Sequence, residues 1–480
     1  MPPESGRKFD MRPTPTPAAP EAATWRDAVG AMVDALRAIA EGSGERALTQ
    51  RNALLAFAVR VVSAALLYLT QIVLARWMGT TDYGIYVFVW TWVLVLGGLC
   101  HLGINLAMIR LVPAYRETGD DALLRGLLRG GRIMALLLGT AVAAAGMAGL
   151  CAFGDRLATP YLMPLYIALV CVPLFALTEV QDGIGRGAAW MDVALLPPYV
   201  LRPLLLLAAM LAANLGGLPM EAETAAGAAI VATWLTAVVQ LVLVNRRIAA
   251  TIEPGERRYD IRGWLGVSLP LMLIAASELV LQNADILVIS RYMTPADVGI
   301  YFAAAKTMSL ILFVHYAVGS AVANRFATLH ARGDREALVA FVRDAVNWTF
   351  WPSLAAALLI LALGLPLLRL FGPAFEVGYP VMMVLVVGFL ARAAMGPAEF
   401  LLNMMGEQQL CAAVLMVSAA LDIALCFALV PAMGLLGAAI ATALSLATAA
   451  ALNYLVARRR LEIEIAIWHN LPGRTPRADA

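Results

Sequence analysis

Long apolar runs separated by short polar segments make up most of the chain between residues 51 and 458. A bilayer with a hydrocarbon core about 30 Å thick is crossed by a helix of roughly 20 apolar residues. Twelve runs reach that length, so the pattern predicts twelve membrane-spanning helices. Their approximate limits are 53–76, 84–111, 132–153, 160–180, 193–214, 224–245, 264–290, 298–323, 342–364, 377–402, 409–430 and 434–457.

The chain repeats itself at an offset of 215 residues, because residues 76–86 and 291–301 are identical at six of eleven positions. The two copies open the second and the eighth predicted span. Six spans separate them, so the halves run the same way through the membrane and are related by a pseudo-two-fold axis along its normal. We predict an all-α integral membrane protein of two parallel six-helix bundles. The predicted divisions are an N-terminal extension (1–50), the first bundle (51–250), the second bundle (251–458) and a tail (459–480).

The arginines outside the spans are distributed unevenly. Most lie in the loops after the even-numbered spans and in the tail, whereas the opposite loops contain only Arg76, Arg156, Arg291 and Arg369. Loops rich in Lys and Arg stay in the cytoplasm. The distribution therefore predicts a multi-pass membrane protein with both termini in the cytoplasm.

Composition agrees with this class, since 61% of residues are hydrophobic and 14% are charged. Soluble proteins have about 25% charged residues. A net charge of +2 gives no support for nucleic-acid binding. The five cysteines fall in apolar runs. The sequence contains neither a Cys/His cluster nor a nucleotide-binding Gly-rich loop, so we expect no metal site and no cofactor.

The N-terminal extension contains one segment with helical periodicity. Between Trp25 and Ala40 the apolar residues fall on one helical face, whereas the first two dozen residues are rich in Pro and Ala. An amphipathic helix on the inner leaflet and a poorly ordered tail are both compatible with this pattern.

Several residues of the repeat have architectural roles in this prediction. Asp82 and Asp297 precede spans at positions where a carboxylate caps free helix amides. Small residues let helix backbones approach one another closely. The glycines expected to do this are Gly84, Gly227, Gly299 and Gly437.

The first copy of the repeat, with the following Tyr115-Arg116 and Gly119-Asp120, resembles the N-terminal signature of polysaccharide-export proteins, including the O-antigen flippases. The stretch 430–442 is similar to that family's C-terminal signature. The family belongs to the multidrug/oligosaccharidyl-lipid/polysaccharide exporters, so the resemblance implies two six-helix bundles forming a V around a central cavity. His101 departs from the pattern, because the family often has an acidic residue there.

The resemblance implies a function in the synthesis of cell-surface polysaccharide, whether lipopolysaccharide O-antigen or exopolysaccharide. The expected cargo is a polyprenyl-pyrophosphate-linked oligosaccharide that moves from the inner to the outer leaflet. Membrane lipids, a polysaccharide polymerase and a co-polymerase are the expected partners.

Four cations lie inside predicted spans, where a charge costs about 2.5–3.5 kcal/mol on insertion scales and usually faces a bundle interior or a wet cavity. They are Arg60, Arg202, Lys306 and Arg392. Guanidinium groups offer forked donors that match phosphate oxygens, so these residues are candidate ligands of the pyrophosphate. The alternative is that each cation pairs with a neighbouring carboxylate.

Three acids inside spans are candidates for ion coupling: Glu278 and Asp285, seven residues apart in the seventh span, and Asp422 in the eleventh. A buried carboxylate can carry a proton or ligate Na⁺. Internal ion pairing, for example of Asp285 with Arg291 or Lys306, is the alternative.

Three function classes follow from the sequence. A lipid-linked oligosaccharide flippase, which is not an enzyme, fits the intramembrane cations best. A cation-coupled multidrug antiporter would share the fold but favours an acidic cavity. A membrane sugar polymerase or ligase fits least, because the predicted outward loops are short.

Overall fold

A computed structural model describes residues 45–154 and 159–470, and within them the chain is almost entirely helical and contains no strand. The predicted segment from Trp25 to Ala40 lies outside these residues. By its contacts the chain divides into two compact units, Met1–Phe57 and Ala58–Ala480. Apart from residues 51–57, both predicted bundles belong to the second unit, which is described below.

The helices follow the predicted spans closely. The first half contains α2 (Glu45–Cys100), α3 (Ile104–Glu117), α4 (Asp121–Phe153), α5 (Thr159–Leu169), α6 (Val172–Gly187), α7 (Met191–Leu196), the π-helix η2 (Pro197–Leu201), α8 (Arg202–Leu215) and α9 (Ala222–Thr251). The second half contains α10 (Ile261–Tyr292), α11 (Pro295–Ser309), α12 (Leu312–Ala331), α13 (Arg335–Ala362), α14 (Gly364–Phe371), η3 (Pro373–Gly378), α15 (Tyr379–Ala394), α16 (Ala398–Met404), α17 (Gln408–Met433), α18 (Leu435–Val456), η4 (Ala457–Leu461) and η5 (Ile467–His469).

Ten helical stretches in the described residues are long and apolar enough to cross a membrane, and α5 with α6, bent by 48°, makes an eleventh. The stretch Val61–Cys100 covers most of the first and second predicted spans, and between them, at Gly79, the backbone leaves helical geometry with φ 74°. The all-α membrane fold is therefore confirmed. The count is consistent with the twelve predicted spans.

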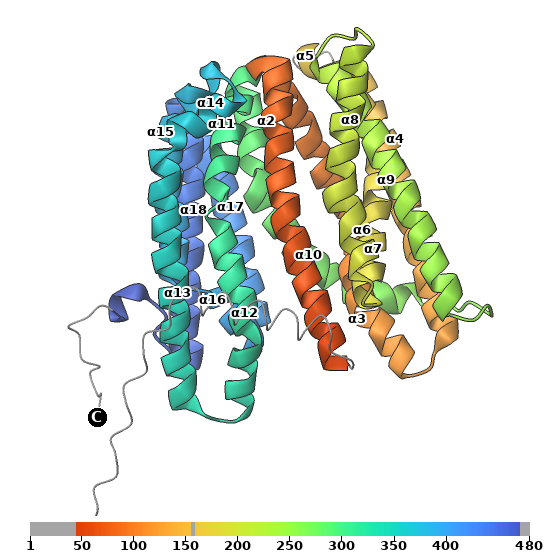
Figure 1. Ribbon diagram of the computed structural model, residues 1–480, viewed down its shortest axis with the longest axis vertical. Coiled ribbons are helices and arrows are strands. Elements are labelled where there is room, and N and C mark those ends of the chain that lie inside the picture. Colours follow the sequence, from red (N-terminus) through yellow and green to blue (C-terminus); the bar gives the residue numbers. More distant parts are fainter. Residues whose placement is uncertain (1–44, 155–158, 471–480) are drawn as a thin grey trace, which may run out of the picture. The chain divides into compact units, whose positions relative to one another are not determined.

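Helices pack mainly within their own half of the sequence. In the first half, α6 packs against α3, α4 and α9, and in the second half α18 packs against α15 and α17. Figure 1 shows α4, α8 and α9 together on one side and α13, α15 and α18 together on the other. This grouping agrees with the two sets of helices that the repeat predicts.

Four spans are broken, in corresponding pairs of the two halves. The second and eighth spans break at 101–103 and 310–311, and the fourth and tenth break at 170–171 and 395–397. Gly103 and Gly396 adopt positive φ at these breaks, and Pro397 cannot donate a helical hydrogen bond. Such breaks leave polar backbone groups that need partners inside the protein.

The two copies of the repeat touch each other through their glycines. A Cβ atom on Gly84 would lie 1.7 Å from the carbonyl oxygen of Pro295, and one on Gly299 would lie 2.8 Å from that of Thr80. Because Thr80 and Pro295 are themselves repeat equivalents, the contact is reciprocal, as a local two-fold axis requires. The predicted close approach is right for Gly84, Gly299 and Gly437 but wrong for Gly227, where an added Cβ atom would have open space around it.

Further bonds join the halves at this end of the helices, which carries the arginine-poor loops and is called the arginine-poor end below. The Arg76 guanidinium donates to the carbonyl oxygens of Leu370 at 2.7 Å and Arg369 at 2.9 Å. The hydroxyls of Tyr68 and Thr307 are 3.0 Å apart. Backbone and side-chain contacts therefore hold the two halves together here.

At the opposite, arginine-rich end the segment between α9 and α10 binds the start of α4. Arg258 donates its backbone N–H to the carbonyl oxygen of Ala122 at 2.9 Å and forms an ion pair with Asp120. The first part of α10 also packs on α3, because the Trp264 ring nitrogen donates to the Tyr115 hydroxyl at 3.2 Å. A Cβ on Gly103 would lie 2.5 Å from the carbonyl oxygen of Ser268, so the backbones of α3 and α10 touch.

The two aspartates of the repeat cap helices in different ways. Asp297 forms a capping box with Thr294 at the start of α11, so the predicted helix cap is present there. Asp82 instead accepts the backbone N–H of Ala222 at 3.1 Å, so it caps α9 and not its own helix. The prediction of a local cap was wrong for Asp82, because α9 begins close to the α2 backbone.

Part of the predicted tail is docked on the second half. Ile463, Ile465 and Ile467 are buried together with apolar side chains of α12, α13 and α16. Arg335 forms an ion pair with Glu462 at 3.0 Å. The segment 461–470 therefore covers the arginine-rich end of these helices.

The glycine contact generates a stability prediction. Replacing Gly84 by Ala pushes a methyl group into the Pro295 carbonyl, and overpacking costs about 1–3 kcal/mol or more. We expect less folded protein and a lower melting temperature for the purified G84A variant in detergent. The matched control is Gly227→Ala, which has open space around it. Equal melting temperatures for the two variants would show that the contact does not hold the halves together.

Candidate functional site

Arg202 is placed inside the first half by a local distortion of the fifth predicted span. Pro197 and Pro198 begin the π-helix η2, and Arg202 follows directly as the first residue of α8. Its guanidinium carbon lies 5.2 Å from the centre of the Phe175 ring and 5.7 Å from that of Trp90. Aromatic faces attract such a cation, so the two rings stabilise the buried guanidinium.

One guanidinium nitrogen of Arg202, Nη1, is buried and has no hydrogen-bond partner among the described residues. The Glu179 carboxylate on α6 and the Tyr199 and Tyr86 hydroxyls lie within electrostatic reach. A buried donor without a partner is costly. Arg202 therefore retains a donor that an anionic ligand could occupy.

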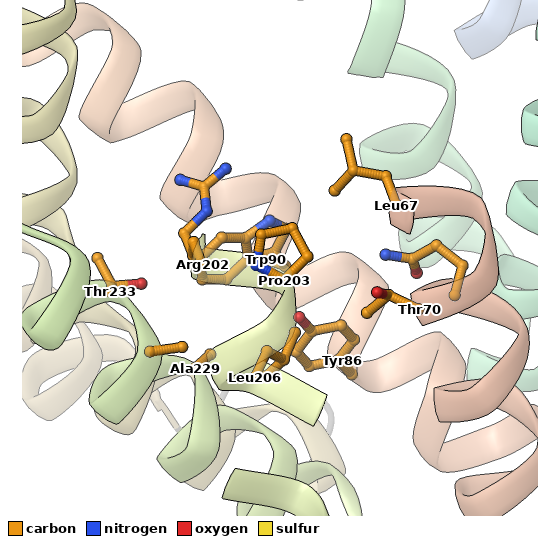
Figure 2. Close-up of a pocket in the computed structure, with 11 residues that line it drawn as sticks. Leu67, Thr70, Tyr86, Trp90, Arg202, Pro203, Leu206, Ala229 and Thr233 are labelled. Atoms are coloured by element: carbon orange, nitrogen blue, oxygen red, sulfur yellow. The ribbon is translucent and has the colours of Figure 1, made fainter. Parts of the chain in front are cut away.

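A small pocket lies beside Arg202, with about 40 Å³ of space. Polar groups of Thr70, Gln71, Tyr86 and Thr233 line it together with Trp90. Figure 2 shows Thr70 on α2 and Thr233 on α9 at opposite sides of the pocket. The space suits roughly three water molecules, so it is a polar subsite and not a chamber for a whole lipid-linked sugar.

A second charged pair continues along α6 from Glu179. Arg186 forms an ion pair with Asp182 at 2.8 Å and donates to the Tyr199 hydroxyl at 3.4 Å. Glu179 interacts electrostatically with both Arg186 and Arg202. These two cations and two carboxylates balance, so the cluster as a whole carries no net charge.

Arg392 lies in the second half and, unlike Arg202, has a direct ionic partner. Its Nη2 donates to both carboxylate oxygens of Glu399, at 2.9 and 2.7 Å. The pair spans the break between α15 and α16, and the guanidinium carbon lies 5.9 Å from the Tyr316 ring centre. For Arg392 the structure therefore shows the alternative named above for the cations, pairing with a neighbouring carboxylate.

Lys306 and Asp285 lie near each other on α11 and α10. The Lys306 ammonium is 5.1 Å from the Phe302 ring centre and interacts electrostatically with the buried Asp285 carboxylate. Asp285 also accepts the backbone N–H of Ile286 at 2.8 Å, and the Tyr301 hydroxyl lies beside it. No ion pair between Lys306 and Asp285 within 4 Å is found in the described part of the chain.

Asp422 on α17 is fully buried, and neither of its carboxylate oxygens has a hydrogen-bond partner in the described ranges. The Ser445 hydroxyl, which also lacks a partner there, is its near neighbour, and Asp285 interacts with it electrostatically. Two like charges this close disfavour each other. The arrangement suits a proton on one carboxyl or a small cation between the two.

The two remaining candidates are less informative. Glu278 is exposed on α10, one turn from Gln282, which donates to it at 3.3 Å. It lies two turns from the buried Asp285, so the two acids share a helix but not an environment. The side chain of Arg60 lies outside the described part of the chain.

Glu179, Glu399 and His315 were missed in the sequence although each lies within a predicted span. The signal was present, because the argument applied to intramembrane cations and to Glu278 applies equally to them. The partners of these three side chains were not predictable, because they depend on how α6 and α16 are placed after the breaks that precede them. Among the described residues, no group of three or more His, Cys, Asp or Glu could hold a metal ion.

Comparisons with known proteins place this geometry in context. Residues 49–330 match the family model described as polysaccharide biosynthesis protein, and residues 270–428 match the MatE model. No curated protein matches the chain in sequence.

Solved structures share the fold at low sequence identity. An inward-facing multidrug resistance MATE family transporter of the MOP superfamily has a TM-score of 0.70 at 15% identity, covering 83% of this chain and 94% of its own. The lipid II flippase MurJ in an inward closed conformation has a TM-score of 0.66 at 12% identity, covering 84% and 87%. A MOP superfamily transporter from Pyrococcus furiosus, described as having a binding pocket of reverse polarity, has a TM-score of 0.63 at 15% identity, covering 88% and 97%.

The first family model spans more than half of the chain, including the first copy of the repeat, the aromatic-flanked Arg202 and the whole of the first half. The fold extends over the second half as well, since the solved structures cover 83–88% of the chain. The predicted resemblance is therefore confirmed, and the chain belongs to the polysaccharide biosynthesis protein family.

Proposed function

We propose that the protein is a flippase that moves a polyprenyl-pyrophosphate-linked oligosaccharide from the inner to the outer leaflet of the bacterial cytoplasmic membrane. The observation that carries the proposal is Arg202, a guanidinium held between two aromatic rings with one buried donor unused in the described residues. Forked guanidinium donors match the oxygens of a pyrophosphate. Membership of the polysaccharide biosynthesis family supports a lipid-linked sugar as the cargo.

The polar pocket beside Arg202 supports the same assignment. Thr70, Gln71 and Thr233 offer hydroxyl and amide groups within one small space, and Trp90 offers an aromatic face. Hydroxyl and amide groups can bond phosphate or sugar oxygens. We propose that this subsite receives the part of the headgroup next to the pyrophosphate.

The arginine-rich end is proposed to be cytoplasmic, because the unequal arginine distribution follows the positive-inside rule. The bonds of Arg76 and the contact of Gly84 with Pro295 would then close the outer side. Alternating access requires that this contact open while another forms at the cytoplasmic side. Polymerase and co-polymerase partners would receive the cargo after its release outside.

Asp285 and Asp422 are the proposed coupling site of the transport cycle. They are two buried carboxylates that interact electrostatically, and one of them has no partner among the described residues. A proton or Na⁺ would neutralise them. This site also favours the second candidate, a cation-coupled multidrug antiporter of the same fold, to which the MatE match over residues 270–428 adds support.

The cargo assignment is tested by Arg202→Ala in cells. Loss of a charged contact to phosphate weakens binding by about 1.5–3 kcal/mol, or roughly ten- to a hundredfold. We expect lipid-linked sugar to accumulate on the inner leaflet and surface polysaccharide to fall, at normal protein level in the membrane. Arg202→Lys should rescue only partly, because it keeps the charge and loses the fork.

The matched control is Arg247→Ala, which removes an exposed arginine paired with Asp192 at 2.8 Å. Export should stay normal in this variant. Normal export and normal protein level in Arg202→Ala would instead place the cargo elsewhere and reopen the drug-antiporter alternative. Extrusion of cationic drugs by the wild type, without any effect on surface polymer, would favour that alternative directly.

The coupling site is tested by Asp422→Asn on the purified full chain. An ion that binds only the folded protein raises the stability of that protein by mass action. The wild type should therefore melt at a higher temperature in Na⁺ than in K⁺ or, if the ion is a proton, gain stability as the pH falls. The variant should lose that response, whereas the exposed control Asp344→Asn should keep it. Identical responses of wild type and Asp422→Asn would exclude Asp422 as the coupling group.

A further inference from the structure

His315 is a buried histidine that the proposed function does not use. It lies on α12, just after the break at 310–311, and is 3% exposed. Neither ring nitrogen has a hydrogen-bond partner among the described residues. Leaving a buried polar group without a partner costs about 1–3 kcal/mol, so such a group calls for an explanation by a ligand, a proton or a second state.

The position of His315 is fixed by tight packing between α12 and α16. Its ring centre lies 6.2 Å from that of Phe400 and 5.7 Å from that of Tyr316. One turn further along α12, a Cβ on Gly319 would come within 2.3 Å of the Phe400 ring. The imidazole therefore has little room to turn away towards a distant partner.

The charged groups around His315 come from five helices. Arg392 on α15 and Glu399 on α16 both interact with it electrostatically. Glu278 on α10 and Tyr316 on α12 interact with Arg392, and the Cys411 thiol on α17 interacts with both members of the ion pair. A proton on the imidazole would place a positive charge within electrostatic reach of the Glu399 carboxylate.

The ion pair beside His315 also crosses a joint in the chain. Arg392 and Glu399 are seven residues apart, about 10 Å along an unbroken helix, yet their nearest atoms are 2.7 Å apart because the helix breaks between them. Gly396 adopts φ +60° in that break. If Glu399 moved away from Arg392, the guanidinium would lose its ionic partner. The break at residues 395–397 would also lose the ion pair that bridges it.

We propose that His315 is a proton-binding site and that Glu399 passes from Arg392 to His315 when the imidazole is protonated. The proton comes from water and binds a ring nitrogen, which creates an N–H donor. The two hydrogen bonds from Arg392 Nη2 to Glu399 break, and a bond from the imidazolium to the Glu399 carboxylate forms. Arg392 is then free to contact the pyrophosphate, a step that rests on the proposed function.

The experiment uses the full-length protein in lipid nanodiscs with isotope-labelled histidine rings. The chain contains four histidines, so His315→Gln assigns the His315 signals. As the pH falls from about 8 to about 3.5, we expect His315 to become charged and to show a ring N–H signal that exchanges slowly with water, because it is bonded. Glu399→Gln should remove that bonded signal.

Inorganic pyrophosphate serves as the probe of the link to cargo. If the anion takes Arg392 away from Glu399, the proton affinity of His315 should rise by about tenfold, one pH unit in its titration midpoint. Linkage requires pyrophosphate to bind about tenfold more tightly to the protonated form. His101 is the control in the same spectrum: it is equally buried, but its Nδ1 accepts the Gly103 backbone N–H at 3.2 Å.

The outcomes separate the two proposals. A His315 ring that stays neutral down to about pH 3.5, or a bonded N–H signal that persists in Glu399→Gln, overturns the exchange. Should Glu399→Gln reduce the amount of folded protein, Arg392→Gln replaces it, and the bonded signal should then form at a higher pH. If the exchange occurs but pyrophosphate does not affect it, His315 stands as the proton site and Arg392 is excluded as a ligand of the cargo.

Discussion

The contact between the backbones of Gly84 and Gly299 is the constraint on which the arrangement of the two halves depends. A side chain at either position would collide with a carbonyl oxygen of the other repeat copy. The contact lets Tyr83 pack its ring against Phe302 and Phe375, with ring centres 6.3 and 5.8 Å apart, and lets Arg76 reach the carbonyls of residues 369 and 370. Small residues thus allow large ones around them to join the halves.

Charge is buried differently in the two halves. In the first half Arg202 is held by aromatic rings and keeps an unused donor in the described structure. In the second half Arg392 is bonded to Glu399, and two further carboxylates, Asp285 and Asp422, are buried together. Burying a charge costs several kcal/mol unless it finds a partner. The first half is therefore suited to an incoming anion and the second to an incoming cation or proton.

Much of the fold could be predicted from the sequence, because bilayer thickness fixes the length of an apolar run and the repeat fixes the relation of the halves. The broken spans were harder to predict. Pro173 and Pro397 lie at or near two of the breaks, but the break near Leu310 has neither Gly nor Pro at its centre. The role of Asp82 was not predictable either, since it caps α9, which begins 140 positions further along the chain.

The candidate site shows the same limit. Intramembrane charge pointed to Arg202, Arg392, Asp285 and Asp422, and the same criterion applied evenly would have added Glu179 and Glu399. The sequence could not indicate which cation has a partner, because that depends on side-chain reach across helix breaks. Arg392 reaches Glu399 across such a break, whereas Arg202 lies against two aromatic rings and forms no ion pair within 4 Å in the described residues.

The attachment of α10 to both halves has a mechanical consequence. Its first part is held to α3 near Ser268 and its later part packs along α17, with Pro270 just beyond the first attachment. Any rotation of one half against the other therefore has to be taken up as curvature of this single helix, where proline has already removed one backbone hydrogen bond. Asp285 lies beyond Pro270 on this helix. We therefore expect bending of α10 to change how strongly the Asp285 carboxylate binds a proton or cation, and that binding to change how readily α10 bends.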